Sequence, residues 1–188
     1  CYYDTASLSV VCGNSATTAS AQNTVTLGSG ATTSGANSIA IGASTSATGT
    51  NGVAMGNGSI SWSTSVAIGS SALSRDDGAI AIGTNTIASG SNGIAVGQRA
   101  QALASNTISI GTTAGLNANS DYDIAIGSAA GANAVGVTTS IGSNNTAIGR
   151  NVLIGGNAGE NIAGSLNVAL GANTGKGAVG SKNTYIGS

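Results

Sequence analysis

The hexapeptide Asn37-Ser38-Ile39-Ala40-Ile41-Gly42 contains an Ile-Ala-Ile-Gly motif that recurs, with close variants, along the chain. The other copies are Val25-Thr26-Leu27-Gly28, Val53-Ala54-Met55-Gly56, Val66-Ala67-Ile68-Gly69, Ile80-Ala81-Ile82-Gly83, Ile94-Ala95-Val96-Gly97, Ile108-Ser109-Ile110-Gly111 and Ile124-Ala125-Ile126-Gly127. From Gly28 onward, the spacings between successive motif glycines are 14, 14, 13, 14, 14, 14 and 16. Self-similarity at so short a period predicts a solenoid, in which no single repeat buries a core alone.

Each repeat also has a half-period, because Gly28, Gly35, Gly42, Gly49 and Gly56 follow one another every seven residues. Seven residues accommodate a short strand and a tight turn, where glycine reaches positive φ without a Cβ clash. The 31 glycines in 188 residues argue against helices. One coil is therefore predicted to contain two strands and two glycine turns.

Within a strand, side chains alternate between two faces, so Ile39 and Ile41 lie on one face and Ala40 on the other. We expect the branched residues to fill the coil and the alanines to form a close contact between chains. Such a coil buries too little apolar surface to offset an ordering entropy of roughly 1 to 2 kcal/mol per residue. The sequence thus predicts an obligate homo-oligomer whose contact residues are Ala40, Ala54, Ala67, Ala81, Ala95 and Ala125.

The repeats resemble the N-S-V-A-I-G head repeat of trimeric autotransporter adhesins, as in the Yersinia adhesin head. The resemblance rests on Asn37 to Gly42, Asn51 to Gly56, Thr64 to Gly69 and Asn92 to Gly97, and it extends over roughly residues 23–188. It implies an all-β, left-handed parallel β-roll that assembles as a homotrimer. It also implies a surface fibre whose stalk and membrane anchor lie outside this sequence.

The second half of the chain has longer coils. Gly155, Gly171 and Gly187 recur at a spacing of 16, whereas Gly142, Gly149 and Gly155 come at spacings of seven and six, so the register changes after Gly142. We therefore divide the chain into a cap at 1–22 and a β-roll head at 23–188, with 14-residue coils at 23–111 and longer, irregular coils at 112–188. Repeats of the longer kind also occur in chains that resemble phage tail fibres.

The segment 1–22 does not fit the repeat and is predicted to cover the open end of the solenoid. It contains both cysteines, Cys1 and Cys12, which suggests a disulfide in an exported chain. Alternatively, Cys1 is a processing remnant or the acylated first residue of a lipoprotein. No apolar run is long enough for a signal core or a membrane span, so no direct membrane insertion is expected from this segment.

The inventory of reactive groups is poor. Without histidine, the chain has no ordinary Ser-His-Asp triad and no His-ligated metal, and two cysteines alone make no structural zinc site. Asp76-Asp77 beside Arg75 fits a calcium site, an ion-pair ladder or simply a solvated turn, and Asp121 to Asp123 fits a solvated loop. We predict no enzyme and no catalytic, cofactor-binding or metal-binding residues. A net charge of −1 with five scattered cations also disfavours nucleic acid.

Surface recognition remains, and its candidate residues are those that interrupt the pattern of small side chains. Trp62 is a possible ligand contact if it is exposed, although it could instead pack across a trimer or against a neighbouring coil. Tyr2 and Tyr3 either meet a target at the end of the fibre or pack within the cap. Arg99 lies in a turn and Tyr122 in the insertion of a longer coil, and both are candidates for ligand contact or for solvated positions.

These features favour an adhesin head that attaches to host, prey or abiotic surfaces through weak contacts multiplied over three chains. Its partners would be an extracellular matrix protein, a glycan or another cell-surface target. Its location would be the bacterial cell surface, with outer-membrane anchoring through regions outside this sequence. The alternative is a structural spacer of a surface fibre or phage tail fibre without a ligand of its own.

Overall fold

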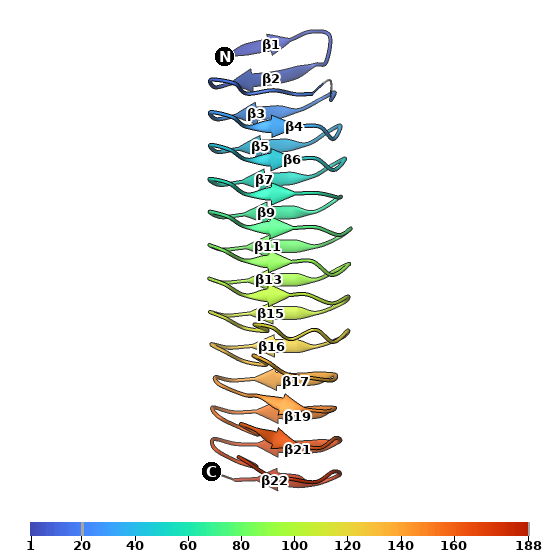
Figure 1. Ribbon diagram of the computed structural model, residues 1–188, viewed down its shortest axis with the longest axis vertical. Helices are drawn as coiled ribbons and strands as arrows, with labels where there is room; N and C mark the ends of the chain where they lie inside the picture. Colours follow the sequence, from blue (N-terminus) through green and yellow to red (C-terminus); the bar gives the residue numbers. More distant parts are fainter. Residues whose placement is uncertain (20, 188) are drawn as a thin grey trace. The chain divides into compact units, whose positions relative to one another are not determined.

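The computed structural model describes residues 1–19 and 21–187, and within them all regular structure is β, with no helix. The chain divides into two compact units, Cys1–Asn92 and Gly93–Ser188. Each unit is a β-solenoid of stacked parallel coils, so the predicted fold class is confirmed (Figure 1). None of the described segments is a helix long and apolar enough to cross a bilayer.

Unit 1 contains two sheets whose strands alternate along the chain (Figure 1). The first sheet has the order β1 (Tyr2–Asp4), β2 (Ser9–Cys12), β3 (Val25–Leu27), β5 (Ile39–Ile41), β7 (Val53–Met55), β9 (Val66–Ile68) and β11 (Ile80–Ile82). The second sheet stacks β4 (Thr32–Thr33), β6 (Ser46–Ala47), β8 (Ile60–Ser61), β10 (Leu73–Ser74) and β12 (Ile87–Ala88). Every coil of the repeat therefore contributes one strand to each sheet, as the half-period predicts.

Neighbouring coils are joined by parallel backbone hydrogen bonds. The Ile39 amide donates to the Gly52 carbonyl at 2.9 Å, and the Gly42 amide donates to the Leu27 carbonyl at 2.7 Å. Gly42 has a φ of 135°, and a Cβ built on it would lie 2.6 Å from the Gly56 carbonyl oxygen of the next coil. The motif glycine is thus required both by the turn and by the close stacking of coils.

Small side chains fill the interior of the unit 1 coils. Ala40, Ala47 and Ala54 form one fully buried cluster that draws on both sheets. Across the same interior, the hydroxyl oxygens of Thr26 and Thr33 are 2.7 Å apart, which joins facing strands β3 and β4. The two sheets lie so close together that an alanine, serine or threonine side chain occupies the space between them.

The predicted roles of the two strand faces were therefore wrong. Ala40 and its counterparts point into their own coil, with only 0 to 3% of their surface exposed, so they cannot form a contact between chains. The six alanines are Ala40, Ala54, Ala67, Ala81, Ala95 and Ala125. The branched residues on either side, such as Ile39 and Ile41, point outward instead. Alternation was predicted correctly, but the thin interior admits only the smaller set.

Unit 2 has the same plan, but its coils, measured between motif glycines, vary from 13 to 16 residues. Its first sheet has the order β13 (Ile94–Val96), β15 (Ile108–Ile110), β16 (Ile124–Ile126), β17 (Thr138–Ile141), β19 (Asn151–Ile154), β21 (Asn167–Leu170) and β22 (Thr184–Ile186). On the other side are β14 (Gln101–Ala102) and the pair β18 (Ala147–Ile148) and β20 (Ile162–Ala163). Here larger side chains enter the core, where Leu153 and Ile162 pack with Ala147, Ala158 and Ala169. The interior of this unit therefore admits branched aliphatic side chains.

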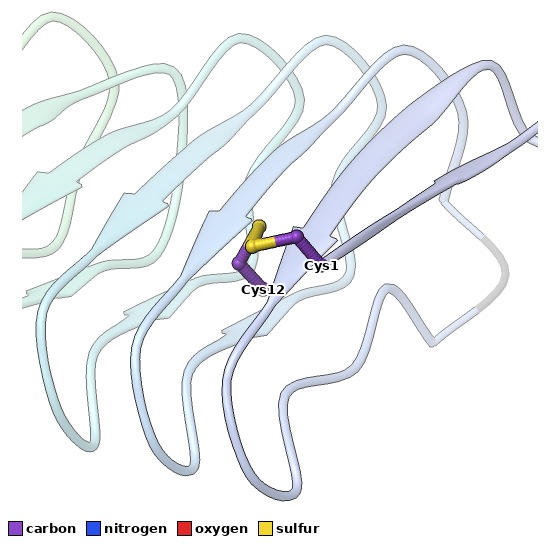
Figure 2. The surroundings of a disulfide bond; sticks show 2 residues. All are labelled: Cys1 and Cys12. Atoms are coloured by element: carbon purple, nitrogen blue, oxygen red, sulfur yellow. A yellow bond between two sulfur atoms is a disulfide. The ribbon is translucent and has the colours of Figure 1, made fainter.

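A disulfide-linked hairpin precedes the repeats. Strand β1 pairs antiparallel with β2 in a register that places Tyr2 opposite Val11, and a disulfide joins the flanking Cys1 and Cys12, whose Cα atoms are 4.0 Å apart (Figure 2). The predicted pairing of the cysteines is confirmed. Strand β2 already pairs in parallel with β3, so coil stacking begins at Ser9, inside the 1–22 segment assigned to the cap.

Candidate binding surfaces

In each unit, the outward side of the first sheet carries aligned columns of branched side chains, which we call the aliphatic face of that unit. Parallel pairing places Ile39 beside Val53 and Ile41 beside Met55, and the same register continues from coil to coil. The face comprises Val25, Leu27, Ile39, Ile41, Val53, Met55, Val66, Ile68, Ile80 and Ile82 in unit 1, and Ile94, Val96, Ile108, Ile110, Ile124, Ile126, Ile141, Val152, Ile154, Val168 and Leu170 in unit 2.

Stacking covers these side chains only in part. Met55, Ile82, Ile110 and Ile154 keep 37 to 40% of their surface exposed. In unit 2 a hollow of about 330 Å³ opens on the same face and is lined in part by Val152, Leu166 and Val168. Continuous apolar surface of this kind is uncommon on soluble monomers and marks a site of association. This face was not predicted from the sequence, although its branched residues recur there at regular spacing.

Trp62 and Arg75 form a contact on the outer side of the second sheet in unit 1. The Trp62 indole is 52% exposed, and the guanidinium carbon of Arg75 lies 5.2 Å from the centroid of its ring. The spacing from Trp62 to Arg75 equals the length of the coil from Gly56 to Gly69, so stacking places one side chain above the other. A cation over an indole ring is an attractive arrangement. The prediction identified Trp62 but missed Arg75, which the coil spacing would have revealed.

The two candidate tyrosines of the cap lie on different sides of strand β1. Tyr2 pairs with the buried Val11, whereas Tyr3 pairs with Val10, which in turn pairs with Val25 of the aliphatic face. Both rings are exposed, at 59% and 57%. Because paired residues in an antiparallel ladder point to the same side, Tyr3 extends the aliphatic face and Tyr2 does not.

In unit 2, Arg99 and Tyr122 are exposed and both have positive φ, 59° and 66°. Arg99 lies in the turn that follows β13, whereas Tyr122 lies in the turn that precedes β16. The structure therefore places these two candidates at opposite ends of the strands and does not bring them together.

Asp123, expected in a solvated loop, is instead inside a unit 2 coil and only 2% exposed. Its Oδ1 accepts a hydrogen bond from the Thr138 amide at 2.6 Å, and its Oδ2 has no hydrogen-bond partner. Burial raises the pKa of the carboxyl group to about 6, although the hydrogen bond from the Thr138 amide acts in the opposite direction. Asp121 and Tyr122, next to it, are exposed.

Charged groups on the surface are sparse and dispersed. In the described part of the chain, the one ion pair between side chains joins Lys176 and Glu160 at 2.7 Å. Asp77 accepts a hydrogen bond from the Thr64 amide at 3.4 Å, while Arg75 lies over Trp62. No three His, Cys, Asp or Glu residues of the described segments lie close enough together to hold a metal ion.

Stacked short coils with a small-residue interior and an aliphatic outer face define a repeat protein of the β-solenoid class. Comparison with protein families gives the YadA head domain repeat (2 copies), which matches residues 19–45, 34–59, 63–86 and 88–114. Through these repeats the chain belongs to the YadA-like head domains of trimeric autotransporter adhesins. A search of curated proteins found no match.

Family membership sets the general role. YadA-like heads are trimeric, surface-exposed adhesin domains that bind extracellular targets, and they are not enzymes. The adhesin and repeat character predicted from the sequence is therefore supported at the level of the family.

Proposed function

We propose that this chain is the homotrimeric head of a bacterial surface adhesin and attaches to a matrix protein, a glycan or another cell-surface target. Outer-membrane anchoring would be provided by regions outside this sequence. The proposal is supported by the YadA head repeats and by the disulfide between Cys1 and Cys12, which is typical of proteins in oxidising compartments.

The aliphatic face is the observation that supports assembly as a trimer. Fully burying an isoleucine or valine contributes about 1.5 to 3 kcal/mol, so covering the more exposed members of the face, such as Ile82 and Ile110 at 38%, would add on the order of 0.5 to 1 kcal/mol each, and covering the half-buried members would add less. The face recurs on every coil of each unit, which makes the summed gain large enough to offset the cost of association. Three chains that cover this face replace the alanine contacts expected from the sequence.

The outer side of the second sheet would then remain free for a target. In unit 1 it carries the Trp62–Arg75 contact, and exposed aromatic and arginine side chains are frequent energetic centres of binding sites. Tyr2, Arg99 and Tyr122 stay candidate contacts because they are exposed. Tyr3, which extends the aliphatic face, is assigned to the contact between chains. Three copies of a weak site multiply its effective affinity.

The test is binding of the purified chain to immobilised matrix proteins, glycans and whole cells. Trp62→Ala and Arg75→Gln should weaken binding at least tenfold without changing assembly. Ser89→Ala is the matched control and should bind like the unsubstituted chain. Ser89 occupies the position of Trp62 and Arg75 in the coil that follows that of Arg75. If the unsubstituted chain binds none of these targets, the spacer function would be favoured instead.

A further inference from the structure

One coil of unit 2 is shorter than its neighbours. The spacing from Gly142 to Gly155 is 13, whereas that from Gly127 to Gly142 is 15 and that from Gly155 to Gly171 is 16. Pairing of β18 with β20 aligns Ala147 with Ile162, which are five and seven residues beyond their motif glycines. The short coil therefore lacks two residues in the turn that leads into the second sheet.

The missing residues interrupt a regular ladder. In the longer coils this turn has a further position of positive φ six residues after the motif glycine, occupied by Asn117, Asn133, Asn161 and Gly177. The Asn133 amide donates to the Leu116 carbonyl, and the Gly177 amide donates to the Glu160 carbonyl, one coil back in each case. The Asn161 amide finds no such carbonyl in the short coil and donates instead to the Thr146 hydroxyl oxygen at 3.0 Å.

A hollow opens where the turn is missing. It has a volume of about 230 Å³ and is lined by Asn133, Thr146, Ala147, Ile148, Asn161 and Ile162. We call it the notch. It lies beside β18 and β20, on the side of unit 2 away from the first-sheet strands that carry the aliphatic face. A trimer built through the aliphatic face would leave the notch open to solvent.

The polar groups of the notch retain hydrogen-bonding capacity. Asn133 Oδ1 accepts from Asn117 Nδ2 at 3.1 Å, but in the described chain neither the Asn133 Nδ2 nor the side-chain amide of Asn161 has a protein partner. The Thr146 hydroxyl accepts from Asn161 and still has a proton to donate. Ile148, 59% exposed, supplies an apolar surface between these groups.

We propose that the notch binds one neutral pyranose ring of a glycan. Two carboxamides and a hydroxyl match the hydroxyl or acetamido groups of a sugar, while Ile148 matches the C–H face of the ring. No charged residue lines the notch, and the nearby Glu160 is paired with Lys176. The volume is below the roughly 300 to 1,000 Å³ typical of sites for drug-sized ligands, which limits the occupant to about one ring.

This inference deepens the proposed adhesive function by naming a ligand class, and it rests on that function only for its biological role. The test is a titration of the isotope-labelled chain with the methyl glycosides of glucose, galactose and N-acetylglucosamine, followed through the side-chain amide signals of Asn133 and Asn161. At least one sugar should shift these signals with saturation and a dissociation constant on the order of 1 mM, as expected for so small a ligand. Sialic acid methyl glycoside, which is charged, should bind at least tenfold more weakly.

Two variants localise the binding. Replacing residues 143–147 with a copy of residues 156–162 restores the two missing residues, should fill the notch with a turn of the chain and should abolish the shifts. Ile148→Ser should weaken binding at least fivefold without remodelling the turn. Asn173→Ala, two residues after Gly171 and outside the notch, is the control.

Absence of saturable shifts with all three neutral sugars would overturn the inference, as would binding unaffected by both notch variants or stronger binding of the sialic acid glycoside. These results would not affect the adhesive function if the chain still attached to cells or matrix. Conversely, if the notch binds sugar but the chain attaches to neither cells nor matrix, the sugar site is supported and the proposed adhesive function is refuted.

Discussion

Asp123 makes the stability of unit 2 depend on pH in the direction opposite to that of a salt-bridged carboxylate. Its carboxyl group is buried, one of its oxygens has no partner, and its pKa is raised from 3.8 to about 6. A raised folded-state pKa means that the unfolded chain releases the proton more readily. The stabilising contribution is therefore complete below about pH 3.8 and is lost as the pH rises through about 6.

The magnitude follows from the shift. At about 1.36 kcal/mol per pKa unit, a rise from 3.8 to about 6 corresponds to about 3 kcal/mol lost between roughly pH 3.5 and pH 7. Asp123→Asn keeps an oxygen that accepts the Thr138 amide hydrogen bond and removes the buried charge. At pH 7 the variant should be more stable than the unsubstituted chain by up to about 3 kcal/mol, and the difference should nearly vanish near pH 3.5.

The assay is guanidinium unfolding followed by circular dichroism at both pH values, for the unsubstituted chain, Asp123→Asn and Asp76→Asn. Asp76 is exposed, so its substitution changes the charge equally without relieving burial and should leave the pH dependence unaltered. A destabilising buried charge at Asp123 is ruled out if Asp123→Asn is no more stable than the unsubstituted chain at pH 7, or if its advantage is as large near pH 3.5.

Three further predictions concern the coils and the cap. Ala54→Leu should lower the free energy of unfolding by about 1 to 3 kcal/mol or more, because Ala54 is fully buried in a thin interior; unchanged stability in a thermal melt would contradict the inward position of the alanines. Gly42→Ala should cost at least about 1 to 3 kcal/mol in the same melt, since its φ is 135° and the added Cβ meets the Gly56 carbonyl, whereas Gly177→Ala, with nothing within 4 Å, should cost less. Cys12→Ser should weaken the hairpin by about 2 to 3 kcal/mol, which predicts faster hydrogen exchange in β1 but not in β11; equal protection of β1 in both chains would show that the disulfide is dispensable there.

The repeat, the two strands per coil and the cysteine pairing could be predicted from the sequence because each depends on spacing. Alternation alone could not show which face of each strand points into the coil. A period of two separates Ile39 from Ala40 but does not say which face is enclosed. The decisive quantity is the separation of the two sheets, which follows from tight turns such as those at Gly42 and Gly49. The small residues at Ser38, Thr45 and Ala47, all buried, were the signal that the interior is thin.

Some features of the candidate sites could likewise be predicted from the sequence, whereas others required the structure. The contact between Trp62 and Arg75 follows from coil length, so the sequence contained it even though it was not recognised. Asp123 was assigned to a loop because it follows Asp121 and Tyr122, yet pairing places it one residue before β16, in the interior column of Thr107 and Thr138. The notch depends on the alignment of three unequal coils, which required the pairing of β18 with β20.

Trimer assembly through the aliphatic face is tested by the mass of the purified chain in sedimentation equilibrium, with and without a charge on that face. Assembly of three chains through the aliphatic face predicts a particle of three times the 17.6 kDa chain mass. It also predicts that Ile39→Asp combined with Ile41→Asp dissociates the trimer, because the charges would be buried without partners. A monomeric mass for the folded chain, or a trimer unaffected by both aspartates, would contradict the claim that three chains cover this face.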